Sequence, residues 1–194
     1  AFSPLCTQSP PGDDDDSASA TCIPCNGSFT ITSLADFADI AACESISGSL
    51  YLDEMDASVT SAPELPCLTS IGSNFHIQES TGLQDLDGFA NLRSVGGDLR
   101  LFFNTQLEQV DGLASLESVG GALDIDLSYG LRNVDGFASL TSVGGELHIY
   151  DDPVLEDFDG FASLQDVGGK LAIALCPAAT HLDGFASLVS IGGH

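Results

Sequence analysis

Apolar residues recur at fixed places along most of this chain, and their spacing predicts the local structure. In residues 131–154 the apolar positions are Leu131, Val134, Phe137, Leu140, Val143, Leu147 and Ile149. The first five lie three residues apart, and an α-helix with that spacing drifts about 60° off its own face at each step. The pattern therefore favours short turns or 3₁₀ segments over a long amphipathic helix. The last two lie two residues apart, which is typical of a half-buried β-strand over 147–149.

The same pattern repeats with a period of 24 residues. Copies begin at Val59, Leu83, Leu107, Leu131, Leu155 and Ala179, and a diverged copy of 25 residues begins at Leu34. One such unit cannot bury its apolar edge without neighbours. We therefore predict an all-β fold, a parallel β-solenoid in which each 24-residue copy forms one coil.

Glycine and aspartate mark the turns of each copy. Gly144-Gly145 directly precedes the predicted strand, where glycine lets the chain turn sharply. Asp135-Gly136 opens an earlier turn, where the aspartate side chain can cap free backbone N–H groups. The same aspartate recurs in the other copies, as Asp87, Asp111, Asp159 and Asp183. We interpret this column of carboxylates as structural turn formers and not as a catalytic array.

Charge excludes several classes of partner. The chain has 29 acidic residues against 4 basic ones, a net charge of −25. A surface this negative repels nucleic acid and anionic lipid, which proteins bind through Lys and Arg. No apolar run approaches the roughly 18 residues of a membrane span, so we expect no direct membrane insertion.

Residues 1–21 differ from the rest of the chain in composition. They consist mainly of Pro, Ser, Asp and Gly, and they include the acidic run 13–16 and Cys6. Such a segment cannot bury enough surface to offset the entropy of ordering it. We predict an acidic, flexible leader or stalk over 1–21, followed by one solenoid domain over 22–194.

The chain has six cysteines, which are Cys6, Cys22, Cys25, Cys43, Cys67 and Cys176. Four of them lie in the first 43 residues, as in the disulfide-bonded end of a secreted domain. Cys22 and Cys25 form a CxxC motif, but it sits among turn residues, and no second CxxC or paired His completes a zinc site. Disulfides are therefore favoured over a metal or redox site, and we predict no metal and no cofactor.

The repeats resemble known families. The stretch Leu99-x-Leu101-x-x-Asn104-x-x-Leu107 looks like a leucine-rich repeat with one extra residue. The place of Asn104 is taken in other copies by small residues that can bond backbone inside a coil, namely Ser80, Ser128, Asp152 and Cys176. With the opening "CNGSFTITSLADFADIAACESISGSLYL" and the "GG-x-L-x-I" strand, residues 22–194 resemble the receptor L domain of receptor ectodomains and microbial surface proteins.

This resemblance implies a right-handed solenoid with leucine-rich-repeat-like coils. It also implies a disulfide between Cys25 and Cys43, because the first two cysteines of the family close the N-terminal end of the core. Cys43 and Cys67 lie at nearly matching places on successive coils, so their pairing is the main alternative. An extracellular location, secreted or at the cell surface, agrees with the family and with the cysteine content.

Residues that alternate with the core positions of each strand point away from the core. These outward positions carry aromatic, imidazole and charged side chains, namely Tyr51, His76, Arg100, Phe102, Asp124, Asp126, His148 and Tyr150. Neighbouring coils lie about 4.8 Å apart in a parallel sheet, so these residues form two ladders. Aromatic rings and Arg on a rigid, exposed surface are typical of binding hot spots. We therefore predict a binding module whose sheet meets a protein or glycan.

Asp124 and Asp126 are the best candidates for catalysis. Their Cα atoms are expected about 6.5–7 Å apart on one strand, which is compatible with the paired carboxylates of inverting glycosidases. The regular coils provide no long loops for a cleft, however, and the histidines are scattered over separate coils. We therefore predict no catalytic residues, and a polysaccharide hydrolase of the β-helix type is the more distant alternative.

The last copy has ordinary core residues where a solenoid usually has a polar cap. Its apolar positions are Leu182, Phe185, Leu188 and Ile191, and His194 follows them. Three expectations follow. The sequence is a fragment of a longer protein, or another copy covers this end, or the protein is an uncapped monomer. In the second case the protein assembles head-to-tail into filaments or oligomers, which is the main alternative function.

Overall fold

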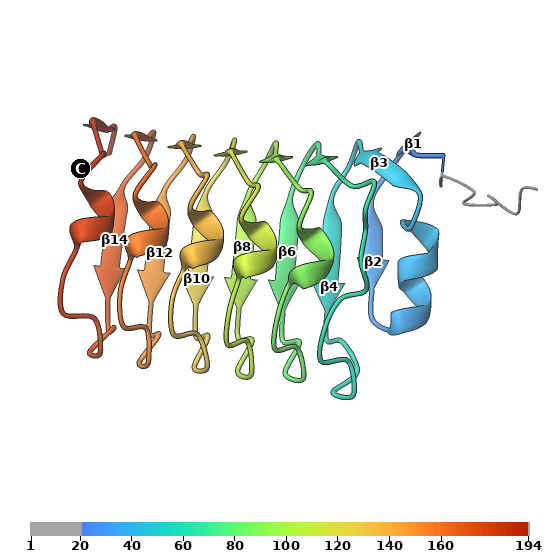
Figure 1. Cartoon of the computed structure of the whole chain (residues 1–194), viewed down its shortest axis with the longest axis horizontal. Helices are drawn as coiled ribbons and strands as arrows, with labels where there is room; N and C mark the ends of the chain where they lie inside the picture. The colour runs from blue at the N-terminus through green and yellow to red at the C-terminus, as the bar shows by residue number, and fades with distance from the viewer. Residues whose placement is uncertain (1–20, 194) are drawn as a thin grey trace, which may run out of the picture.

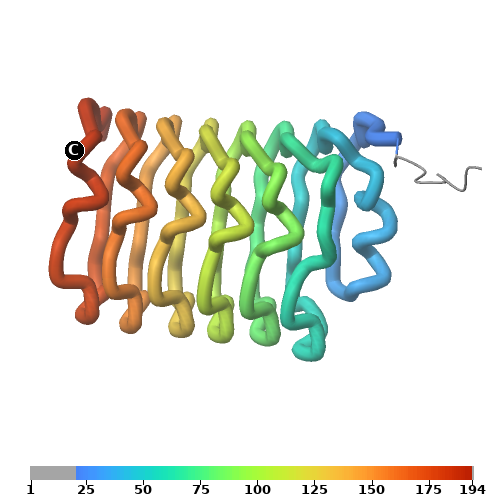
Figure 2. Tube along the Cα trace, viewed as in Figure 1, coloured from blue at the N-terminus to red at the C-terminus, as the bar shows by residue number. Residues whose placement is uncertain are grey.

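The repeats stack as coils along a single axis (Figure 1). The structure, a computed structural model, describes residues 21–193. The predicted leader therefore lies outside the described residues up to residue 20, and so do Cys6 and His194. The coils succeed one another from one end of the molecule to the other, in the order of the sequence (Figure 2).

The longer strands form a parallel sheet of seven strands, here called sheet B. They are β2 (Phe29–Ile31), β4 (Leu50–Asp53), β6 (Phe75–Gln78), β8 (Leu99–Phe102), β10 (Leu123–Asp126), β12 (Leu147–Tyr150) and β14 (Leu171–Ala174). Each residue pairs with its equivalent in the next coil, as Leu99 does with Leu123. The register confirms the repeat, because partners lie 25 residues apart between β4 and β6 and 24 apart from β6 onward.

The shorter strands form a second parallel sheet of eight strands, here called sheet A. They are β1 (Ile23–Cys25), β3 (Cys43–Ile46), β5 (Ser70–Ile71), β7 (Ser94–Val95), β9 (Ser118–Val119), β11 (Ser142–Val143), β13 (Asp166–Val167) and β15 (Ser190–Ile191). Two parallel sheets built from 24-residue coils confirm the predicted parallel β-solenoid.

Short 3₁₀ helices form a row on the side of the coils opposite sheet B (Figure 1). They are η1 (Leu34–Asp39), η2 (Asp87–Phe89), η3 (Asp111–Leu113), η4 (Asp135–Phe137), η5 (Asp159–Phe161) and η6 (Asp183–Phe185). The prediction of 3₁₀ segments at the three-residue spacing is thus confirmed. Five of the six begin at the repeated aspartate.

The repeated aspartate does not act as we expected at these turns. The Asp135 side chain makes no capping hydrogen bond, and its backbone carbonyl instead accepts a bond of 3.0 Å from the Ala138 N–H. The side chain that caps this turn belongs to Asn133, whose Oδ1 accepts from the Asp135 N–H at 3.2 Å. The same bond is made by Asp85 to the Asp87 N–H and by Asp157 to the Asp159 N–H, so in three copies the capping side chain lies two residues before the repeated aspartate.

The repeated glycines are needed because neighbouring coils approach closely, and not for a special backbone conformation. Gly27 is the described glycine with positive φ, and the predicted sharp turn at Gly144-Gly145 uses ordinary φ values. A Cβ on Gly144 would overlap the carbonyl oxygen of Gly120 in the preceding coil. A Cβ on Gly136 would likewise overlap the carbonyl oxygen of Val110. Glycine is thus the residue that lets the coils stack at the spacing of a parallel sheet.

The core runs through the middle of the coils. All seven apolar positions predicted from the copy at 131 are buried, each at most 1% exposed. Phe137 and Phe161 stack with ring centroids 5.5 Å apart, and Phe185 continues the stack at 5.2 Å from Phe161. Burial of a large apolar side chain contributes about 1.5–3 kcal/mol. The repeated phrase therefore specifies one continuous core.

Two disulfides close the N-terminal end of this core. One joins Cys25 to Cys43, the pairing that the resemblance implied. The other joins Cys22 to Cys67, so the alternative pairing of Cys43 with Cys67 is wrong. The two cysteines of the CxxC motif thus point to different coils, and neither is available as a thiolate for metal or redox chemistry.

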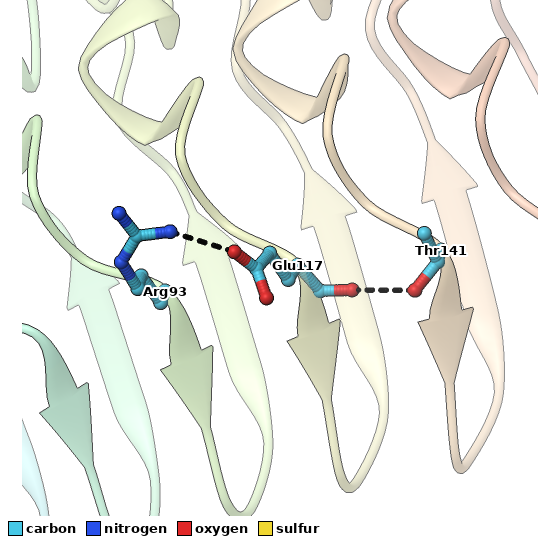
Figure 3. Close-up of polar contacts among 3 residues, drawn as sticks. All are labelled: Arg93, Glu117 and Thr141. Carbon is cyan, nitrogen blue, oxygen red and sulfur yellow. Dashed lines mark hydrogen bonds and ion pairs between the residues drawn. The ribbon is translucent and has the colours of Figure 1, made fainter.

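Polar contacts also cross the coils on their outer surface, ahead of the short strands (Figure 3). The Arg93 guanidinium lies 2.7 Å from the Glu117 carboxylate one coil further on. The Thr141 hydroxyl in the following coil donates to the Glu117 carbonyl at 3.0 Å. Both charged side chains are more than half exposed, so the ion pair contributes little stability. Glu117 is therefore a suitable control residue away from sheet B.

Candidate functional site

The eight candidate binding residues all lie on the outer face of sheet B, in two ladders. Along β4, β6, β8, β10 and β12, buried residues alternate with partly or more fully exposed ones. The first ladder contains Tyr51, His76, Arg100, Asp124 and His148, each paired in register with the next. The second contains Asp53, Gln78, Phe102, Asp126 and Tyr150. Tyr51 and Tyr150 are separated by four strand spacings, roughly 19 Å, so the face is long and its ends do not touch.

An aromatic contact and a hydrogen bond occupy the part of the face over β4 and β6. The Tyr51 and His76 rings meet edge to face with centroids 5.4 Å apart. Gln78 Nε2 donates a hydrogen bond of 2.9 Å to Asp53 Oδ1. Partial burial, and then the charge of Arg100, lower the pKa of His76 below its ordinary value. The His76 imidazole is therefore neutral at pH 7.

Arg100 lies over the ring of Phe102 on the same strand. Its guanidinium carbon is 4.5 Å from the ring centroid, which is a cation–π geometry. This contact holds the Arg100 side chain flat along the face. The guanidinium thus covers one side of the Phe102 ring. Phe102 also pairs in register with Asp126 on the neighbouring strand β10.

Acidic groups gather over β10 and β12. Asp126 Oδ1 lies 3.4 Å from Nδ1 of His148, and the His148 ring stacks on Tyr150 at 5.6 Å. Asp126 Oδ1 is buried and has no hydrogen-bond partner. Burial raises the pKa of Asp126, and burial followed by the charge of Asp126 raises the pKa of Asp124. Ionisation of Asp124 beside ionised Asp126 is therefore disfavoured, and a cation placed close to both carboxylates would offset this cost.

Two aromatic residues of the face were missed by the sequence reasoning. Phe103 and Tyr129 are 37% and 40% exposed, and their ring centroids are 6.4 Å apart. The Phe103 ring also lies 6.4 Å from the Phe102 ring. The three rings therefore form a strip that starts at the last residue of β8 and continues into the corners that follow the strands of sheet B. Phe103 follows β8 with a φ of 55°, a left-handed conformation that strand alternation does not anticipate. In the sequence, the two adjacent aromatic residues Phe102 and Phe103 were the signal that could have indicated these additional exposed rings.

The same left-handed corner occurs in every regular coil. It is formed by residues other than glycine, namely Glu54, Glu79, Phe103, Leu127, Asp151 and Leu175. Such a conformation costs about 1–2 kcal/mol for a residue with a side chain. The corner turns its own side chain outward and the following residue inward, so it decides which residues extend the outer face.

Four surface cavities lie along the described part of the chain, one of them at the end of β14 and the others at corners and turns, and neither Asp124 nor Asp126 lines these four. Within residues 21–193, no group of three His, Cys, Asp or Glu side chains is placed to hold a metal ion. No helix in that range is long and apolar enough to cross a bilayer.

The candidate assembly residues lie in the last described coil. Leu182 and Ile191 are 59% and 47% exposed, whereas Phe185 and Leu188 pack partly against the core. His194 lies outside the described residues. The exposure of Leu182 and Ile191 follows from their place in the last coil, and it does not by itself favour self-assembly.

Comparison of the chain with protein-family models and with curated proteins found no match. The resemblance to receptor L domains therefore stays an expectation. The function proposed below is argued from the residues on the outer face of sheet B.

Proposed function

We propose that this protein is a secreted or cell-surface, non-enzymatic binding module, and that the outer face of sheet B binds a protein with a basic surface. The observation that carries the proposal is the cluster of Arg100, Phe102, Asp126 and Tyr150 on adjacent strands. Rings and charged groups that are held by contacts along a rigid sheet lose little side-chain entropy on binding. Such preorganised groups are typical of hot spots.

Charge supports a basic protein as the partner. The two ladders carry three carboxylates, those of Asp53, Asp124 and Asp126, against one permanent cation, Arg100. The whole chain has a net charge of −25, which would speed the association of a cationic partner at low ionic strength. Lys and Arg side chains of the partner could stack on Tyr150 and pair with Asp126. The disulfides and the resemblance to receptor L domains support an extracellular location.

The proposal is tested by selecting ligands against the immobilised protein from a random peptide library and from a glycan array. We expect peptides rich in Lys and Arg to be selected. Their affinity should fall at least tenfold in Tyr51→Ala, Phe102→Ala or Tyr150→Ala variants that keep the parent melting temperature. Glu117→Gln, which removes an acidic group outside sheet B, should leave the affinity unchanged.

Two results would contradict the proposal in different ways. Equal affinity for all variants would exclude the outer face of sheet B as the binding surface. Selection of glycans alone, with loss of affinity in the same three variants, would retain the face but replace a basic protein by a glycan as its partner.

A further inference from the structure

A ladder of small polar side chains runs inside the solenoid, next to the apolar core. Its members stand two residues after each long strand, at Ser80, Asn104, Ser128 and Asp152, and all four are fully buried. At two steps of this ladder the backbone N–H of one member donates to the side chain of the member in the next coil, whereas Ser128 Oγ has no hydrogen-bond partner. Ser80 N–H donates to Asn104 Oδ1 at 3.1 Å, and Ser128 N–H donates to Asp152 Oδ1 at 2.8 Å.

In Asn104 the second polar atom of the side chain donates back to the preceding coil. Asn104 Nδ2 donates to the Ile77 carbonyl at 2.8 Å. Ser80 Oγ is within donating distance of the Leu52 carbonyl, at 3.4 Å, and of the Gln78 carbonyl in its own coil, at 3.2 Å. The Ile77 and Leu52 carbonyls belong to the third residue of β6 and of β4. For Asp152 the acceptor at the same place is the carbonyl of Ile125, the third residue of β10.

Asp152 in its ionised form cannot complete this pattern. Its Oδ2 stands in the place of Asn104 Nδ2, is buried, and has no hydrogen-bond partner. A carboxylate oxygen there has no proton to donate to a carbonyl, and a buried, unpaired charge is costly.

The charged and titratable groups around Asp152 do not offset this cost. Asp126 and Asp151 both raise its pKa by repulsion, and the neighbouring ladder residue Cys176 is a thiol whose own pKa is raised by burial. The Ser128 N–H acts in the opposite direction, but burial is the largest influence and raises the pKa of Asp152 to about 7.

We propose that below neutral pH Asp152 is a neutral carboxylic acid in the folded protein, donating its Oδ2 proton to the Ile125 carbonyl as the Asn104 amide donates to Ile77. Ionisation removes this donor and leaves a buried negative charge between two coils. Asp152 follows β12, the strand that carries His148 and Tyr150. The protein therefore contains a pH-sensitive contact in the interior, close to the part of the outer face that carries Asp126 and His148.

The direction of the pH effect follows from proton linkage. The unfolded carboxyl titrates near its ordinary value of 3.8, and the folded one at about 7. Between these values the folded state holds one more proton, so stability falls as pH rises. The equilibrium constant for unfolding should rise about tenfold per pH unit in this window because of Asp152, and should gain nothing further from it above the folded pKa.

Three variants isolate this group. Asp152→Asn supplies both an acceptor and a permanent donor, and should remove the Asp152 contribution to the change between pH 4 and pH 7. Asp151→Asn makes the same change of charge at the adjacent corner and should keep the dependence. Asn104→Asp places a second carboxyl in the ladder and should steepen it. The equilibrium constant is measured by denaturant unfolding, and the exchange rate of the Ser128 amide reports the local contact.

A direct titration keeps the proposal testable even if a variant fails to fold. The ¹³C carboxyl signal of Asp152 in the unaltered protein should titrate near pH 7. A midpoint below about pH 4.5 would show an ionised carboxylate at neutral pH and would overturn the proposal. An Asp152→Asn variant with the same pH dependence as the parent would do so as well.

Discussion

Cys22 and Cys67 are bonded to each other although 45 residues separate them, and this bond ties the start of the described chain to the end of the turn before β5. Cys25, only three residues after Cys22, is bonded to Cys43 across 18 residues. The segment 22–25, which consists of Cys22 and β1, is thus fixed to two different coils. The N-terminal end of the core is closed by covalent bonds in addition to packing.

The two disulfides should differ in their contributions to stability. Loop-closure entropy gives about 4 kcal/mol for the 45-residue separation and about 3 kcal/mol for the 18-residue one. We expect a Cys22→Ser, Cys67→Ser double variant to lower the free energy of unfolding at least as much as Cys25→Ser, Cys43→Ser. Urea unfolding of both variants measures this. A clearly larger loss for the shorter loop would show that local packing around Cys43, and not chain entropy, dominates.

Gly136→Ala should be among the most damaging small substitutions. The added Cβ would overlap the Val110 carbonyl oxygen, so the coil must move away from its neighbour, at a cost of about 2 kcal/mol or more. Gly130→Ala is the comparison, because its Cβ would lie 2.9 Å from the Leu107 carbonyl oxygen and needs only a small shift. The melting temperature of Gly136→Ala should be well below that of Gly130→Ala. An equal fall in melting temperature for both variants would contradict the close-approach explanation.

Phe137 gives a test of core packing with a control that the chain itself provides. The equivalent place one coil earlier holds Leu113, and both side chains are fully buried. Phe137→Ala should cost about 3–5 kcal/mol because it leaves a cavity and removes the stack on Phe161. Phe137→Leu should cost much less, since leucine already fits this place. Denaturant unfolding measures the free energy of unfolding of both variants. An equal loss of this free energy would argue against the idea that equivalent core positions accept the same side chains.

Asp126→Asn should change the titration of its neighbour on β10. The charge of Asp126 raises the pKa of Asp124, so its removal should lower that pKa, as measured by carboxyl NMR signals. Because both folded pKa values are raised, these carboxyls stabilise the fold less as pH rises through them. Asp126→Asn should therefore increase stability at pH 7 relative to pH 4. Glu117→Gln should leave the Asp124 titration unchanged, and an Asp124 pKa that stays constant in Asp126→Asn would refute the coupling.

Much of the fold was predictable because the repeat is nearly exact. Identical copies must pair in register if their apolar positions are to meet, so Leu147, Ile149 and their equivalents could be assigned to the core from spacing alone. The same alternation placed Arg100, Phe102 and Asp126 on the outer face of sheet B. The core and the two ladders are thus properties of the one-dimensional pattern, since each coil contacts only its neighbours.

Tertiary structure decided what depends on distances between coils. The partner of Cys22, the close approach at Gly136, and the outward turn of Phe103 all follow from how one coil lies on the next, which spacing within a single copy does not specify. The environment of Asp152 is the clearest case. Its place in the ladder was evident from sequence, but only the stacked coils put its second oxygen where Asn104 has a donor, because hydrogen bonds depend on direction and distance as well as on order along the chain.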